Sequence, residues 1–78
     1  ALTRGELSAQ ERQGLSLVTR REMEVLSLIA RGATNSEIAA EMVIAETTVK
    51  THVSSLMSKL AARDRVALVL LAQRAGIA

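Results

Sequence analysis

Residues 34–60 read TNSEIAAEMVIAETTVKTHVSSLMSKL, and this stretch decides the fold. It opens with a capping box, in which the hydroxyl of Thr34 accepts a hydrogen bond from the amide three residues on. In return, the carboxylate of Glu37 accepts one from the Thr34 amide. The box predicts a short helix over residues 35–42. A second periodic run follows after a connection of about three residues and covers residues 46–60. The stretch therefore predicts two helices joined by a tight turn.

The helix predicted over residues 46–60 has two contrasting sides. On a wheel of about 100° per residue its apolar side chains gather within about 40° of Val49, and they are Val49, Val53, Leu56 and Leu60. The opposite side, called here the hydroxyl face, carries Thr47, Thr51, Ser54, Ser55 and Ser58, with Lys50 at its border. Exposed helix faces usually mix Glu with Lys. A face of hydroxyls without carboxylates favours contact with phosphates and base edges, and an ordinary solvated face is the alternative.

The two helices have the spacing of a helix-turn-helix, in which the first helix crosses the DNA backbone and the second lies in the major groove. Ala39 is small where the helices must cross closely, and Ile38, Met42 and Ile44 supply the apolar wedge that fixes their angle. The spacing, this apolar wedge and the hydroxyl face together predict a unit that binds double-stranded DNA.

Capping signals define two further helices. Thr19 and Glu22 form a capping box for a helix over residues 20–31, which Gly32 ends. Asp64 caps a helix over residues 65–75, closed by Gly76. Residues 1–17 lack a sustained period and are predicted to be a linker, with a helical turn around residues 6–13. The expected fold is all-α: a four-helix helix-turn-helix domain over residues 18–78 with a short N-terminal linker.

The composition excludes several classes of function. The chain has 78 residues, one His, no Cys and no aromatic residue. One His cannot build a metal site, and no nucleophile or carboxylate pair is placed for catalysis. We therefore expect no enzyme activity, no cofactor and no metal. The lack of aromatic residues removes base stacking, so double-stranded partners are favoured. No apolar run spans a bilayer, and a cytoplasmic location is expected.

Five stretches of the chain resemble the LuxR-type DNA-binding domain, the four-helix module also found in NarL-type response regulators. They are LVTRREMEVL at 17–26, NSEIAAEM at 35–42, TVKTHV at 48–53, KL at 59–60 and RDR at 63–65. Sigma-factor region 4 shares the first half of this pattern, but the segment from Lys50 to Val53 and the aliphatic last helix favour the LuxR type. The resemblance implies the output domain of a transcriptional regulator, specifically a two-component response regulator. An upstream receiver or ligand-sensing domain is then expected.

The resemblance also implies roles for individual residues. The family's base-reading positions fall on Lys50, Thr51 and Ser54. Contacts to the DNA backbone are expected from Asn35, Ser36, Thr47, Thr48, Ser58 and Lys59, although Lys59 equally suits the negative end of the helix dipole. Two positions depart from the family pattern. Ala45 replaces the usual Ser or Thr helix cap, and Ser54 replaces a Lys or Asn found in some relatives.

The helix over residues 65–75 is apolar around most of its circumference, more than one buried stripe requires. In the family this helix forms a two-fold dimer contact, which places Val66, Val69, Leu70 and Gln73 at the interface of a homodimer. Burial within the monomer or against an upstream domain is the alternative.

Two polar residues need a structural explanation. Glu22 lies on the same side of its helix as Val25 and Leu26, and we expect a structural ion pair with Arg65. His52 is expected at the edge of the core rather than on DNA. The sequence thus predicts sequence-specific binding of double-stranded DNA, with a sigma-factor region 4-like promoter-binding domain or a helical protein-interaction module as alternatives.

Overall fold

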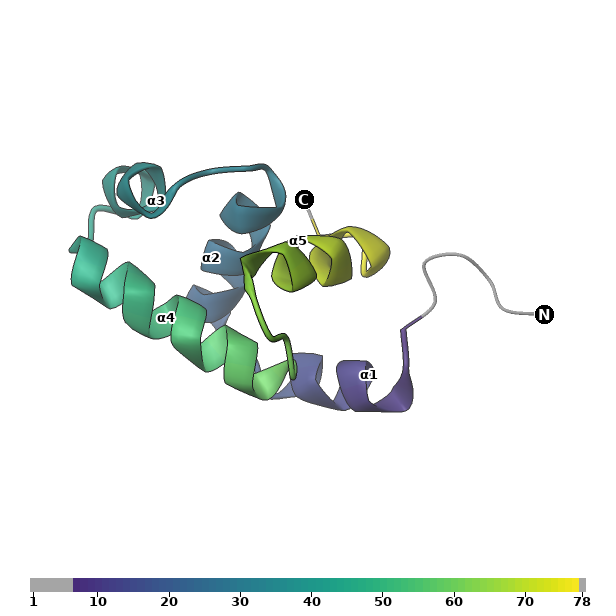
Figure 1. Ribbon diagram of the computed structural model, residues 1–78. Helices are drawn as coiled ribbons and strands as arrows, with labels where there is room; N and C mark the ends of the chain where they lie inside the picture. Colours follow the sequence, from purple (N-terminus) through teal and green to yellow (C-terminus); the bar gives the residue numbers. More distant parts are fainter. Residues whose placement is uncertain (1–6, 78) are drawn as a thin grey trace.

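The computed structural model describes residues 7–77, which form helices and no strand (Figure 1). The helices are α1 (Ala9–Ser16), α2 (Arg20–Ala30), α3 (Asn35–Met42), α4 (Glu46–Lys59) and α5 (Arg65–Arg74). The all-α prediction is confirmed, and α2 to α5 begin at the predicted residues. Within this range, no helix combines the length and apolar character that crossing a membrane requires.

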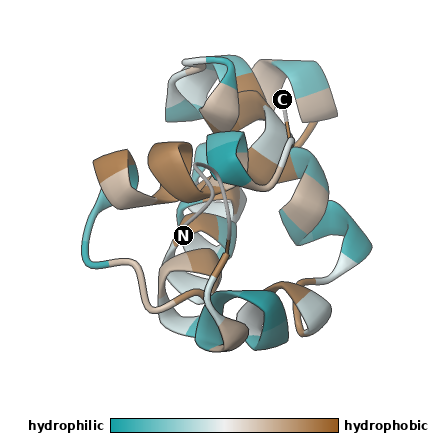
Figure 2. Cartoon of the chain, turned by 90° about the vertical axis from the view of Figure 1, so that its right-hand side faces the viewer, coloured by the Kyte–Doolittle hydropathy of each residue, from teal (hydrophilic) through white to brown (hydrophobic). Residues whose placement is uncertain are grey.

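The core lies where α2 packs against α4 and α5, and α3 packs against α4. Each of these helices contributes apolar side chains at helical spacing, so each has a buried stripe and a polar outer side. Figure 2 shows apolar and polar residues alternating along the helices. The buried apolar residues are Val25, Leu26, Ile29, Ile38, Val49, Val53, Leu56, Leu60, Leu68, Leu71 and Ala72.

Local capping fixes where α2, α3 and α5 begin. The hydroxyls of Thr19 and Thr34 accept hydrogen bonds from the backbone amides of Glu22 and Glu37, each at 3.1 Å. In return, the carboxylate of each glutamate accepts a hydrogen bond from the backbone amide of its threonine. Asp64 accepts the amide of Ala67 at 2.8 Å. Each bond satisfies an amide that the start of a helix leaves without an intrahelical partner. The three predicted caps are therefore confirmed.

Residues 9–16 form helix α1, although they were predicted to belong to a linker. The helix begins with a further capping box, in which Ser8 and Glu11 exchange hydrogen bonds of 3.0 and 2.9 Å. Glu11 also pairs with Arg74 of α5 at 2.8 Å. The linker prediction considered leucine spacing and overlooked this box. The four-helix count is corrected to five, while residues 1–6 of the predicted linker lie outside the described residues.

Gly14 allows α1 to approach the end of α4 closely. The glycine is buried, and a Cβ atom at this position would lie 2.3 Å from the backbone carbonyl oxygen of Lys59. No side chain fits into that distance without displacement of the backbone. Gly14 was interpreted as a linker residue, but it is the contact point between two helices.

The turn between α3 and α4 has an unusual backbone conformation at Val43. Its φ of 56° and ψ of 51° lie in the left-handed region, which β-branched residues rarely adopt. The turn is closed by the amide of Ile44, which donates to the carbonyl of Ala39 at 3.0 Å. Val43 is 88% exposed. The turn thus depends on the buried residues on either side of it, because Val43 itself has little contact with the core.

Ala45 is the N-cap residue of α4 and provides no side-chain hydrogen bond. Its backbone already has the extended conformation of an N-cap, with φ of −72° and ψ of 149°. A serine hydroxyl therefore fits this position without rearrangement of the chain.

We predict that Ala45→Ser increases the free energy of unfolding by about 1 kcal/mol, which raises the melting temperature by about 4–8 °C in a domain of this size. Thermal denaturation followed by circular dichroism measures the change. Ala40→Ser, at an exposed position within α3, is the control and should give no increase. A melting temperature for Ala45→Ser at or below that of the parent would contradict the prediction.

Candidate nucleic-acid interface

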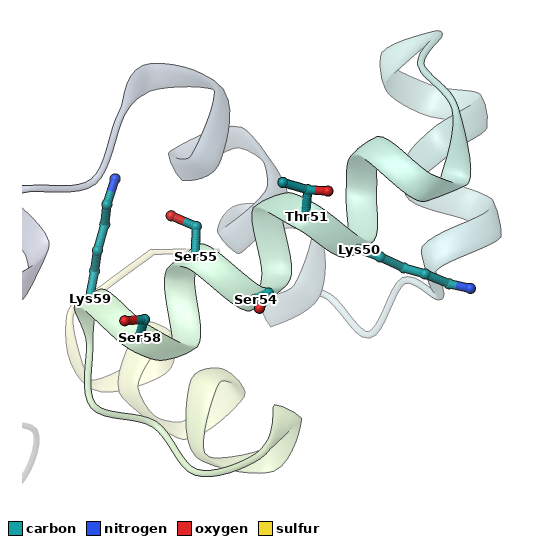
Figure 3. Close-up of a pocket in the computed structure, with 6 residues that line it drawn as sticks. All are labelled: Lys50, Thr51, Ser54, Ser55, Ser58 and Lys59. Atoms are coloured by element: carbon teal, nitrogen blue, oxygen red, sulfur yellow. The ribbon is translucent and has the colours of Figure 1, made fainter.

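The outer side of α4 is exposed because its opposite side is buried. Val49 and Leu56 are fully buried on the inner side of α4, the helix that packs against α2 and α3, which turns Lys50 and most of the hydroxyl face toward solvent. Figure 3 shows Lys50 together with Thr51, Ser54, Ser55 and Ser58 of the hydroxyl face along one helix. A shallow groove of about 520 Å³ follows this side, and it is lined by Lys50, Thr51, Ser54, Ser55, Ser58 and Lys59. The structure therefore brings together the three predicted base-reading residues.

The three predicted base-reading residues differ in which of their side-chain hydrogen-bonding groups are already used within the protein. Lys50 is exposed, projects away from the helix (Figure 3), and makes no hydrogen bond or ion pair with residues 7–77. Ser54 is exposed as well, and its hydroxyl has no partner in this range. Thr51 donates its hydroxyl proton to the carbonyl of Thr47 at 3.1 Å. The methyl group and oxygen lone pairs of Thr51 are thus left for a ligand, whereas Lys50 and Ser54 have donors to offer.

Glu22 does not pair with Arg65, so that prediction was wrong. The Glu22 carboxylate instead accepts hydrogen bonds from Lys59 Nζ at 2.6 Å, from Ser55 Oγ at 2.5 Å and from the Thr19 amide at 2.9 Å. The reason is positional, because the first turn of α2 lies beside the last turns of α4. We call Glu22, Ser55 and Lys59 the carboxylate cluster.

Arg65 has a different role at the start of α5. Its guanidinium donates to the side-chain oxygen of Asn35 at 2.6 Å and to the carbonyl of Ala33 at 2.7 Å. It therefore fastens α5 to the connection between α2 and α3. Because the Asn35 oxygen is occupied by Arg65, the amide NH₂ is the group that Asn35 can offer to a phosphate.

Two opposing effects determine the pKa of Glu22. Burial raises the pKa because it disfavours the charged form, but the hydrogen bonds from Lys59, Ser55 and the Thr19 amide outweigh burial and lower the pKa to about 2. The side chain of Glu22 is only 7% exposed. A charged carboxylate thus sits directly beside the C-terminal end of the groove.

The remaining residues predicted to contact the DNA backbone differ in their exposure to solvent. Ser36, Thr47, Thr48 and Ser58 are exposed. Lys59 borders the same groove, but its ammonium group is bound to Glu22 and its side chain is 26% exposed. His52 is half-buried at the edge of the core, as the wheel predicted.

A comparison with known families identifies the domain. Residues 16–72 match the model of the family described as bacterial regulatory proteins, luxR family. The chain belongs to this family. The predicted resemblance is confirmed, and with it a helix-turn-helix DNA-binding domain of a transcriptional regulator.

Individual relatives of this luxR-family domain are substantially longer. The chain is 50% identical over 62 residues to the uncharacterized transcriptional regulatory protein YhcZ of Bacillus subtilis, which covers 80% of this chain and 29% of YhcZ. It is 52% identical over 56 residues to the response regulator protein VraR of Staphylococcus aureus and to that of Staphylococcus epidermidis. Each of those matches covers 72% of this chain and 27% of VraR. The chain thus spans less than a third of these relatives.

The carboxylate cluster was missed at the sequence level, although part of its signal is visible. Ser55 and Lys59 are four residues apart on one helix, so their side chains are neighbours. Nothing in the pattern indicates that Glu22, which is 37 positions from Lys59, lies beside them. The contact depends on how α2 crosses α4, and a helical wheel describes one helix at a time, so it cannot predict how two helices cross.

We predict that the stability advantage of the parent over Glu22→Gln depends on pH. The pKa of Glu22 in the folded state is lower than its ordinary value of 4.5, so the charged carboxylate stabilises the fold above about pH 4.5. This contribution is lost as the pH falls from about 4.5 toward 2. Urea unfolding of both chains between pH 7 and pH 3 measures the difference.

Glu24→Gln is the matched control, because it removes the same charge from an exposed ion pair with Arg21 on the same helix. Exposed pairs contribute about 0–1 kcal/mol, so this variant should resemble the parent at pH 7. An advantage of the parent over Glu22→Gln that is equally large at pH 3 and pH 7 would contradict the assignment.

Proposed function

We propose that this domain binds double-stranded DNA sequence-specifically by placing the hydroxyl face of α4 in the major groove. The observation that carries the proposal is the exposed side of α4, which combines Lys50 with the exposed hydroxyl residues Thr47, Thr51, Ser54 and Ser58 and carries no carboxylate of α4. A major groove is wide enough to admit one helix and displays hydrogen-bonding groups that differ between base pairs. The action proposed is binding alone, without chemical conversion.

Base recognition is proposed for three residues. Lys50 donates to O6 and N7 of guanine, and the Thr51 methyl contacts a thymine methyl. Ser54 has an unoccupied hydroxyl that either donates or accepts. Phosphate contacts are proposed for Asn35 and Ser36 at the start of α3, where free amides favour an anion. The α4 residues proposed for the same role are Thr47, Thr48 and Ser58.

We further propose that the domain is the output part of a two-component response regulator, with a receiver domain upstream. Two observations support this. VraR is named a response regulator protein, and the match occupies only 27% of it. The share left over provides room for a second domain in such a protein.

We predict that the chain binds duplex DNA with an affinity that falls steeply with salt, because phosphate contacts release counterions. Lys50→Ala should in addition lose about 1–3 kcal/mol of discrimination at one base pair. Selection of duplexes from a random pool, followed by fluorescence anisotropy on single base-pair variants, measures both effects.

Arg12→Ala is the charge-matched control for Lys50→Ala. Arg12 is exposed on α1, and its guanidinium donates to the carbonyl of Leu7. Helix α1 lies beside the C-terminal end of α4 (Figure 1), whereas Lys50 belongs to the N-terminal half of α4. Arg12→Ala should retain the sequence preference of the parent. Equal loss of affinity for every sequence in Lys50→Ala would make Lys50 a phosphate contact instead.

A homodimer formed through α5 is proposed on the basis of its exposed apolar side. Leu68, Leu71 and Ala72 face the core, whereas Val66 is 66% and Leu70 53% exposed. Val69 and Gln73 flank them, half-buried and exposed respectively. Val66, Leu70 and Gln73 are therefore the exposed members of the proposed interface, whereas Val69 packs partly against the core. Two-fold symmetry of the protein would match inverted repeats in the DNA.

We predict that Leu70→Glu lowers the average mass in sedimentation equilibrium, because a buried carboxylate in a self-contact is strongly unfavourable. Val43→Glu introduces the same charge at another exposed apolar position and should leave the mass of the parent unchanged. Equal masses for Leu70→Glu and the parent would reject the α5 contact.

A further inference from the structure

The carboxylate cluster lies at one end of the groove proposed to receive DNA. Ser55 and Lys59 line this groove together with Lys50, Thr51, Ser54 and Ser58. Both side chains bend toward α2 rather than outward from α4 (Figure 3), because Glu22 accepts a hydrogen bond from each. The two ends of the groove thus differ: Lys50 extends freely at one end, and Lys59 is held at the other.

The cluster changes the charge of that end of the groove. The Lys59 ammonium lies 2.6 Å from a Glu22 oxygen, so the two unit charges largely cancel at the distance of a DNA phosphate. Besides Lys59 and Ser55, the backbone amide of Thr19 donates a hydrogen bond to the Glu22 carboxylate. This bond does not involve Lys59, so it holds the carboxylate in place even when Lys59 moves. A phosphate approaching Lys59 would therefore also approach a fixed negative charge.

The cluster also determines the hydrogen-bonding direction of Ser55. Its proton is donated to Glu22 at 2.5 Å, so only oxygen lone pairs face the groove. A phosphate oxygen needs a donor and finds none at Ser55. An amino group on a base edge, by contrast, needs an acceptor and would find one.

We infer that Glu22 is a positioning residue that determines DNA specificity by holding Lys59 and Ser55 at the groove and cancelling the charge of Lys59. The inference rests on the proposed function and deepens it. Sequence-independent affinity comes from the phosphates, whereas the specificity ratio compares specific with non-specific binding. By reducing attraction to phosphates at one end of α4, Glu22 lowers binding to random DNA and leaves base recognition at Lys50, Thr51 and Ser54.

Glu22→Gln tests the inference while keeping the cap of α2, because glutamine also completes a capping box. The probes are a random-sequence duplex of about 20 base pairs, two helical turns, and a duplex that the parent selects from the same pool. Anisotropy is recorded between about 50 and 200 mM salt. The variant should bind the random duplex about three- to fivefold more tightly, with a log–log salt slope steeper by about one. Its ratio of selected to random affinity should fall.

Glu24→Gln is the matched control for net charge, since it removes an exposed carboxylate from the same helix. It should change the random-duplex affinity and the salt slope much less than Glu22→Gln does. Equal effects of the two variants would overturn the inference, because a general change of net charge would then explain both. So would weaker binding of random DNA by Glu22→Gln, which would show that Glu22 presents Lys59 to a phosphate.

A double variant, Glu22→Gln with Lys59→Met, replaces the ion pair by neutral side chains and keeps the test valid if Glu22→Gln alone unfolds. Such replacements are often neutral or stabilising. The inference predicts the salt slope of the parent, because the pair has no net charge in either chain. A slope shallower by about one would overturn the inference, since Lys59 would then be a phosphate contact. If the parent itself binds no duplex, the proposed function fails as well, whereas binding by the parent with unchanged variants rejects the inference alone.

Discussion

The burial of Val49, Val53 and Leu56 determines which side of α4 faces solvent. These side chains fill the space between α2, α3 and α4, and a rotation of α4 by one residue would expose them and bury hydroxyls. The free energy of apolar burial therefore sets the orientation of the helix. Presentation of Lys50 and most of the hydroxyl face is a consequence of this packing, since none of residues 7–77 makes a hydrogen bond or ion pair with the Lys50 side chain.

Local sequence was sufficient for most of the fold. Capping boxes act within four residues, so the starts of α2 and α3 could be located at Thr19 and Thr34 without knowledge of the tertiary structure. The amphipathic pattern of residues 46–60 gave the exposed side of α4 in the same way. Helix α1 has an equally clear capping box at Ser8 and Glu11. The box was overlooked because the apolar pattern of this helix is too short to predict a helix by itself.

Contacts between distant residues could not be obtained in this way. The wheel placed Glu22 correctly on the inner side of α2, yet it offered no basis for choosing Lys59 over Arg65 as a partner. Both cations follow Glu22 by roughly forty positions, and only the crossing of α2 and α4 separates them. Four predicted DNA-facing residues, Lys50, Thr51, Ser54 and Ser58, line one exposed groove of α4. Lys59 borders the same groove, but it has a protein partner that the pattern did not reveal.

The contact at Gly14 joins backbone to backbone. A side chain at such a junction would change rotamer and absorb a small displacement, but an α-carbon against a carbonyl oxygen has no rotamer to change. The same helix contacts α5 through the ion pair of Glu11 with Arg74. Helix α1 therefore bridges the C-terminal ends of α4 and α5, two segments that are far from it in the chain.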